Sequence, residues 1–143
     1  MINESRIDIY NYVCGLIPAT LTKNVYAFEQ PQELTDSDTK NGFIVVRIDD
    51  FNDESEFKGY TYGWVRVYIE AYVPTQSRGR LDKAKYKSFE DGITNAINAE
   101  MATPTSSTYT IDEQGFLSMD ATEDTNANNL YHMFIKSFIV TIN

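Results

Sequence analysis

The sequence is poor in the residues from which catalytic and metal sites are most often built. It holds one cysteine, Cys14, and one histidine, His132, among 143 residues. A single cysteine excludes an intrachain disulfide and favours a reducing, intracellular setting. A zinc site would have to rely mainly on Asp and Glu, which is rare. We therefore interpret Cys14 as a small hydrophobe of a helix and His132 as a structural residue of a strand.

Membrane, export and catalytic signatures are also missing. No run of about 18 apolar residues predicts a membrane span, and Met1-Ile2-Asn3-Glu4 lacks the basic start of a signal peptide. A phosphate-binding glycine-rich loop, a nucleophile elbow and a Cys-x-x-Cys motif are absent from the sequence. We expect no cofactor, no metal and no enzymatic activity. A small carboxylate-dependent hydrolase stays open as an alternative, because 21 acidic residues are available.

Acidic and aromatic residues, in contrast, are abundant. The 21 Asp and Glu outnumber the 12 Lys and Arg, and a net charge of −9 disfavours general binding to nucleic acids or anionic membranes. Ten tyrosines suit half-buried sheet faces and protein interfaces. The length and the 42% of hydrophobic residues are typical of one globular unit. We expect a single α+β domain over residues 1–143.

Hydrophobic periodicity predicts two helices and six strands. The first helix, over 3–17, ends before Pro18, and the second covers 81–101. Polar loops are expected over 32–42 and 120–129, and a hairpin turn at Gln114-Gly115. The expected strands cover 25–29, 43–48, 60–73, 107–111, 116–119 and 130–142. The order α-β-β-β-α-β-β-β indicates a mostly antiparallel sheet with two helices packed on one face.

The strand over 60–73 alternates clearly between two kinds of side chain. Such alternation assigns the two sets to opposite faces of a sheet. The set expected to meet the core is Val65, Val67, Ile69, Ala71 and Val73. The set expected on the other, partly wet face is Trp64, Arg66, Tyr68, Glu70 and Tyr72.

Charge is unevenly distributed along the chain. No Lys or Arg occurs from Ser88 to Ile135. Just before this stretch, five basic residues crowd into ten positions with a single acid, Asp82: Arg78, Arg80, Lys83, Lys85 and Lys87. Cations at the start of a helix oppose its dipole, at about 0.3–1 kcal/mol each. We expect an acidic partner surface to compensate; the alternative is a solvated face screened by salt.

A second candidate contact surface is the acidic connection between two predicted strands, formed by Asp49, Asp50, Asp53, Glu54 and Glu56. Its oxygen atoms could bind Ca²⁺ or Mg²⁺, but the spacing does not fit a calcium loop and the glycine of such a loop is missing. We interpret it as a solvated hairpin tip. Separately, the basic cluster and the stretch from Ser88 to Ile135, which holds eight Asp and Glu and no Lys or Arg, form unlike patches that suit head-to-tail self-association into rings.

The order of elements also resembles a known family. A helix ends at Leu16-Ile17-Pro18, and the short strand Val25-Tyr26-Ala27-Phe28 follows. Then come two longer strands, the second carrying the alternation from Trp64 to Val73, a helix ending at Ile93-Thr94-Asn95-Ala96-Ile97-Asn98, and a long C-terminal strand. This pattern resembles the tail-terminator and head–tail joining (connector) proteins of tailed bacteriophages and prophages. The resemblance covers nearly the whole chain. It rests on the order and size of the elements and involves no signature motif.

The resemblance implies a structural virion protein that is assembled in the cytoplasm of the bacterial host. Its partners would be copies of itself in a ring and the tail-tube and head-connector proteins, with DNA only passing through the lumen and no membrane involved. A third interpretation is a cytoplasmic adaptor that holds a ligand on the row of Trp64, Tyr68 and Tyr72. A ligand-sized apolar cavity beside that row would favour the adaptor.

Overall fold

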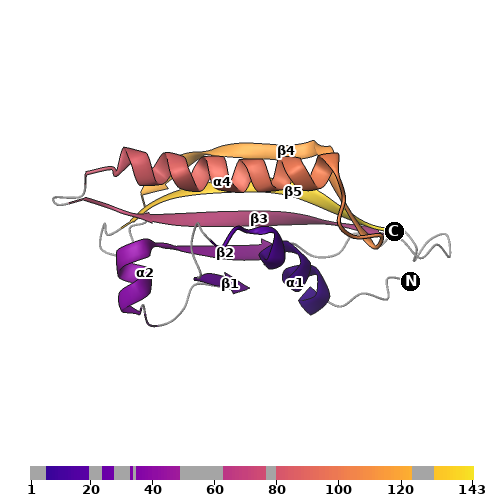
Figure 1. Cartoon of the computed structure of the whole chain (residues 1–143), viewed down its shortest axis with the longest axis horizontal. Helices are drawn as coiled ribbons and strands as arrows, with labels where there is room; N and C mark the ends of the chain where they lie inside the picture. The colour runs from indigo at the N-terminus through magenta and orange to yellow at the C-terminus, as the bar shows by residue number, and fades with distance from the viewer. Residues whose placement is uncertain are drawn as a thin grey trace.

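A computed structural model of the chain describes residues 6–19, 24–27, 33, 35–48, 63–76, 80–123 and 131–143, with only the backbone given for residues 39 and 113–123. Its elements are α1 (Arg6–Leu16), β1 (Val25–Ala27), α2 (Asp36–Asn41), β2 (Phe43–Ile48), β3 (Gly63–Pro74), α4 (Lys83–Ala102), β4 (Tyr109–Glu123) and β5 (Tyr131–Ile142). The strands form one sheet in the order β1-β2-β3-β5-β4 (Figure 1). All neighbouring pairs are antiparallel except β1 and β2, which are parallel. The expected α+β fold with a mostly antiparallel sheet is confirmed.

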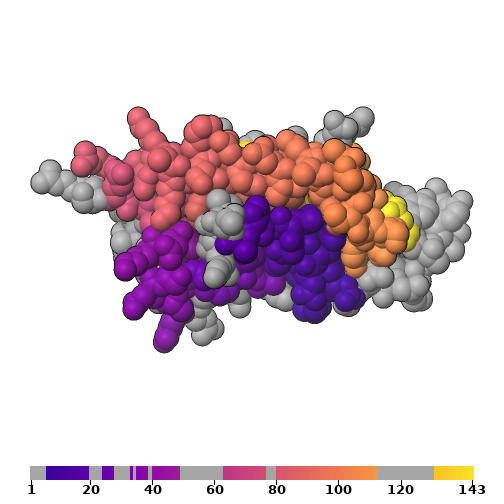
Figure 2. Space-filling view, in the orientation of Figure 1, coloured from indigo at the N-terminus to yellow at the C-terminus, as the bar shows by residue number. Residues whose placement is uncertain are grey.

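The main core lies between one face of the sheet and the helices α1 and α4. In β3 the alternation holds as expected, and Val65, Val67 and Ile69 are fully buried. From α1 the core receives Ile9, and from α4 it receives Ile97, both on the helix stripe that meets the sheet. Figure 2 shows the helix side of the molecule, where α1 packs beside the C-terminal half of α4.

A smaller aromatic cluster occupies one end of the opposite sheet face. Phe43 of β2 and Tyr72 of β3 are paired across the strands, and their rings stack at 4.5 Å between centroids. Tyr131 of β5 meets the ring of Phe43 edge-on at 5.3 Å. Tyr72 is therefore only 2% exposed, so the expectation of a partly wet position is wrong for this residue. The remainder of that row, from Trp64 to Glu70, is half-buried as expected.

The expected loop over 32–42 is wrong, because α2 lies within it. Thr35 caps this helix: the Asp38 amide donates to Thr35 Oγ1 at 3.1 Å, and the Thr35 amide donates to Asp38 Oδ2 at 2.9 Å. This reciprocal capping box satisfies two amides that the first turn leaves without partners. Gly42 ends the helix with a φ of +82°. Six polar residues thus form a helix without any apolar stripe.

The expected hairpin at Gln114-Gly115 is also wrong, because β4 is one continuous strand paired with β5. The register shifts between Asp112 and Leu117 and again between Met119 and Thr122, so the extra residues are absorbed as irregularities of the strand. Among the described residues the order is consequently α-β-α-β-β-α-β-β and not α-β-β-β-α-β-β-β. Residues 120–123 of the expected loop belong to β4, and the rest of that loop lies outside the described residues.

Candidate functional site

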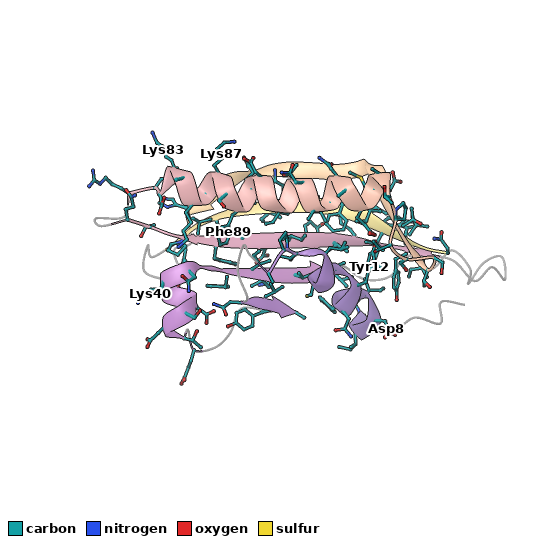
Figure 3. All side chains as sticks on the ribbon, in the orientation of Figure 1. Asp8, Tyr12, Lys40, Lys83, Lys87 and Phe89 are labelled. Carbon is teal, nitrogen blue, oxygen red and sulfur yellow. The ribbon has the colours of Figure 1, made fainter. Side chains whose placement is uncertain are left out.

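The basic cluster lies at the N-terminal end of α4, where Lys40 of α2 joins it. Lys85 Nζ donates to the Lys40 carbonyl at 3.1 Å, which fixes α2 beside the start of α4. Lys87 Nζ forms an ion pair with Asp91 at 2.8 Å one turn further along. Arg78 lies outside the described residues. We call the described residues of this surface the basic end: Lys40, Arg80, Lys83, Lys85 and Lys87 (Figure 3).

Among the described residues, the unfavourable interaction between this cluster and the helix dipole is only partly relieved. Asp82 caps α4 and accepts the Lys85 amide at 3.1 Å, but the first turn contains no acid. The hydrogen bond and the charge of Asp91 raise the pKa of Lys87 above its usual value. Arg80 and Lys83 are exposed, and their side chains form no hydrogen bond or ion pair with a described residue. The basic end therefore leaves cations available at the positive end of a helix.

The second expected surface is the acidic connection between β2 and β3. Asp49, Asp50, Asp53, Glu54 and Glu56 all lie outside the described residues. Within the described ranges, no group of three or more His, Cys, Asp or Glu gathers as the ligands of a metal ion would. Among the helices of these ranges, none is both long and apolar enough to cross a membrane.

A buried carboxylate that the sequence did not single out lies at the opposite end of α4. Glu100 is 4% exposed and accepts the Tyr12 hydroxyl of α1 at 3.0 Å. The Thr105 hydroxyl donates to Glu100 Oε1 at 2.6 Å, and the Thr105 amide donates to the same oxygen at 3.0 Å. Burial of the phenol, with the adjacent Glu100 carboxylate, raises the pKa of Tyr12 well above its usual range. These bonds tie α1, α4 and the segment after α4 together.

An open hollow of about 580 Å³ adjoins this carboxylate, between the C-terminal ends of α1 and α4. The last turn of neither helix contains a basic residue. A helix C-terminus carries a partial negative charge of about half an electron, so two such ends and Glu100 make the hollow electronegative. We call it the acidic hollow, and its lining consists of Gly15, Leu16, Ala96, Ala99, Glu100, Ala102, Thr103 and Thr105.

On the sheet face that α1 and α4 leave uncovered, charged side chains interact with neighbours on the same face. Arg47 Nε contacts Glu70 Oε2 at 2.7 Å, and the Tyr72 hydroxyl donates to Glu70 Oε1 at 2.9 Å. On the same face, Trp64 and Tyr68 are half-buried. We call this surface, away from the aromatic cluster, the open face. Polar groups satisfied within the face and large amphipathic rings are typical of a protein-contact surface.

The other groups with possible chemistry are held in separate places. Asp38 is fully buried and accepts the Tyr26 hydroxyl at 2.8 Å, so it and Glu100 belong to different hydrogen-bond networks. Cys14 is half-buried against the core, and burial raises the pKa of its thiol, which lowers its reactivity. The imidazole of His132 has Nδ1 buried without a hydrogen-bond partner among the residues that the structure describes.

The sequence matches no model of a known protein family and no curated protein. The functional interpretation of this chain therefore depends on the geometry described above.

Proposed function

We propose that this chain is a structural subunit that assembles with copies of itself into a ring, as a tail terminator or head–tail connector of a tailed phage or prophage. The observation that carries the proposal is the open face. One side of the sheet buries the core under α1 and α4, whereas the other presents half-buried rings to the outside. A sheet face of this composition gains free energy when a second protein surface covers it.

The charge of the chain supports the same proposal. A net charge of −9 keeps DNA from adhering to the wall of a lumen through which it passes. In this proposal the neighbours of the ring are the tail-tube and head-connector proteins, and the protein is part of the virion after assembly in the host cytoplasm. The element order gives only part of this support, because α2 is inserted between β1 and β2 and one strand, β4, replaces two of the expected strands.

The structure offers less support for a ligand-binding adaptor or a hydrolase. Tyr72, which would form part of a ligand platform, is stacked under Phe43 and 2% exposed. The acidic hollow lies between α1 and α4, not beside that row. A hydrolase would need two carboxylates in one cleft, whereas Asp38 and Glu100 are engaged in separate networks.

The mass of the purified chain tests the proposal. Native mass spectrometry and light scattering are expected to give a multiple of 16.4 kDa, and electron microscopy is expected to show rings. A double variant, Trp64→Ala with Tyr68→Ala, is expected to weaken the assembly while the secondary structure, followed by far-ultraviolet circular dichroism, stays unchanged. Ile7→Ala, which removes an exposed apolar side chain from α1, is the matched control. A monomer mass at every concentration tested would contradict the proposal.

A further inference from the structure

We infer that the acidic hollow of one subunit receives a basic side chain from the basic end of the next, so that copies join head to tail along α4. This inference rests on the proposed self-assembly and names the contact that would produce it. The two surfaces belong to the same helix but lie at its opposite ends. Figure 3 shows Lys83 and Lys40 toward one end of the molecule and Tyr12, the partner of Glu100, toward the other.

The first argument is the charge at the floor of the hollow. Glu100 is 4% exposed, yet all its described donors are neutral groups of Tyr12 and Thr105. No described Lys or Arg forms an ion pair with it. A buried carboxylate usually has a cation nearby, because neutral hydrogen bonds offset only part of its lost hydration. The converging C-termini of α1 and α4 add to the negative potential.

The second argument is the shape and lining of the hollow. Ala96, Ala99 and Ala102 of α4 and Gly15 of α1 have small or absent side chains, and Leu16 adds an apolar surface. Lys and Arg side chains carry a long aliphatic stem that packs on apolar surface, with the charge at its tip. Such a side chain would lie along the alanines and bring its cation to the negative floor.

The third argument is that the basic end has side chains free to enter the hollow of another copy. Arg80 and Lys83 are exposed, without a described hydrogen-bond or ion-pair partner, whereas Lys85 and Lys87 are already engaged. A helix of 20 residues is about 30 Å long, so the basic end of α4 cannot reach the hollow at the other end of the same helix. The basic end of a second copy can reach it. This single contact would then offset two unfavourable features, the cations at the N-terminus of α4 and the buried Glu100 carboxylate near its C-terminus.

The contact has a consequence for symmetry. It joins two different surfaces and is therefore heterologous, and repeated heterologous contacts close into a ring when the rotation permits. A two-fold arrangement could use the same contact only reciprocally, with each basic end in the hollow of the other copy, and would stop at a dimer. The inferred contact therefore predicts a ring when wild type assembles beyond the dimer.

Two variants, each disabling one surface, test the inference. Arg80→Glu with Lys83→Glu reverses the basic end, and Gly15→Trp fills the hollow. A Cβ built at Gly15 meets no atom within 4 Å, so the new side chain is accommodated without a clash at its base. Each variant is expected to weaken assembly about 10- to 100-fold. Asn11→Trp, which places the same side chain at an exposed position of α1 outside the lining of the hollow, is the matched control and is expected to assemble normally.

Mixing the two variants supplies the decisive measurement. Each retains the surface that the other lacks, so an equimolar mixture is expected to form one-to-one dimers and no larger species. Raising salt from about 0.1 M to about 1 M shortens the Debye length from about 10 Å to about 3 Å and should weaken wild-type assembly. If wild type assembles and either variant assembles equally well, the inferred contact is wrong while self-assembly stands. If wild type stays monomeric, both proposals fail.

Discussion

The Tyr12 hydroxyl donates a hydrogen bond to Glu100 Oε2 at 3.0 Å, although the two residues lie 88 positions apart in the chain. The bond joins α1 to the last turns of α4 at the floor of the acidic hollow. The Tyr12 ring also packs against Tyr109 of β4, with 4.8 Å between centroids. A single side chain therefore positions one helix against another and against the edge strand of the sheet.

Tyr12→Phe is expected to destabilise the fold by about 1–3 kcal/mol, because it leaves one oxygen of the buried Glu100 with fewer donors. Urea denaturation followed by circular dichroism measures the change. Asn11→Ala, at an exposed neighbouring position of α1, is expected to change stability by less than about 0.5 kcal/mol. Equal midpoints for Tyr12→Phe and wild type would show that the bond contributes nothing to stability.

Asp38→Ala is expected to destabilise the fold by about 2–4 kcal/mol, because it removes the capping box of α2 and leaves the Tyr26 hydroxyl without its acceptor. Asp38 is fully buried, whereas Asp36, two residues earlier, is exposed. The control Asp36→Asn changes only the interaction with the helix dipole and should cost under about 1 kcal/mol. Similar losses for the two variants in thermal denaturation would refute the anchoring role of Asp38.

Stability is expected to fall in the alkaline range through Tyr26. Burial of the phenol and its hydrogen bond to Asp38 raise the pKa of Tyr26 from 10.0 to about 12. The folded state thus holds this proton more tightly than the unfolded chain does. The contribution of Tyr26 to the free energy of unfolding is complete below pH 10 and is lost as the pH rises through about 12.

Absorbance titration of tyrosinate, compared between wild type and Tyr26→Phe, would reveal this ionisation as a difference near pH 12. Asp38→Asn removes the negative charge beside the phenol and is expected to move the step back toward 10. A step that stays in place in Asp38→Asn would mean that Asp38 does not contribute to the shift.

Gly42→Ala is expected to destabilise the fold by more than about 2 kcal/mol, because the residue has a φ of +82° and no room for a side chain. A Cβ there would lie 2.4 Å from the Tyr72 carbonyl oxygen. Gly15→Ala provides the contrast, since its Cβ meets open space and alanine favours the helix by up to about 1 kcal/mol. A thermal shift of the same sign for both variants would contradict this assignment.

Residues whose environment is set by local periodicity were predictable from the sequence. The alternation from Val65 to Val73 identified the core face of β3, because a strand presents successive side chains to opposite sides. The basic cluster was equally visible, since five cations within ten positions need no fold to be recognised. Its neighbour Lys40 was not, because only the packing of α2 beside α4 brings it there.

The features that the sequence did not predict share a different cause. Each depends on contacts between residues distant in sequence or on an unusual helix cap. The six residues of α2 show no apolar stripe, and Asp38 replaces the Glu or Gln of the usual capping box. Gln114-Gly115 reads as a turn, yet pairing with β5 on both sides keeps the segment in one strand. Glu100 was merely one acid among many until the fold placed Tyr12 and Thr105 around it.

The position of β5 between β3 and β4 has a consequence for synthesis of the protein. Residues 131–142 pair with both neighbours over most of their length, so the sheet cannot be joined before they leave the ribosome. Until then a nascent chain would hold β2 and β3 as one fragment, with β4 unattached to it. The pairing of β5 with β3 joins segments that are far apart in the sequence, and such pairings form slowly. We therefore expect the translated chain to stay open to chaperones and proteases until β5 is inserted between β3 and β4.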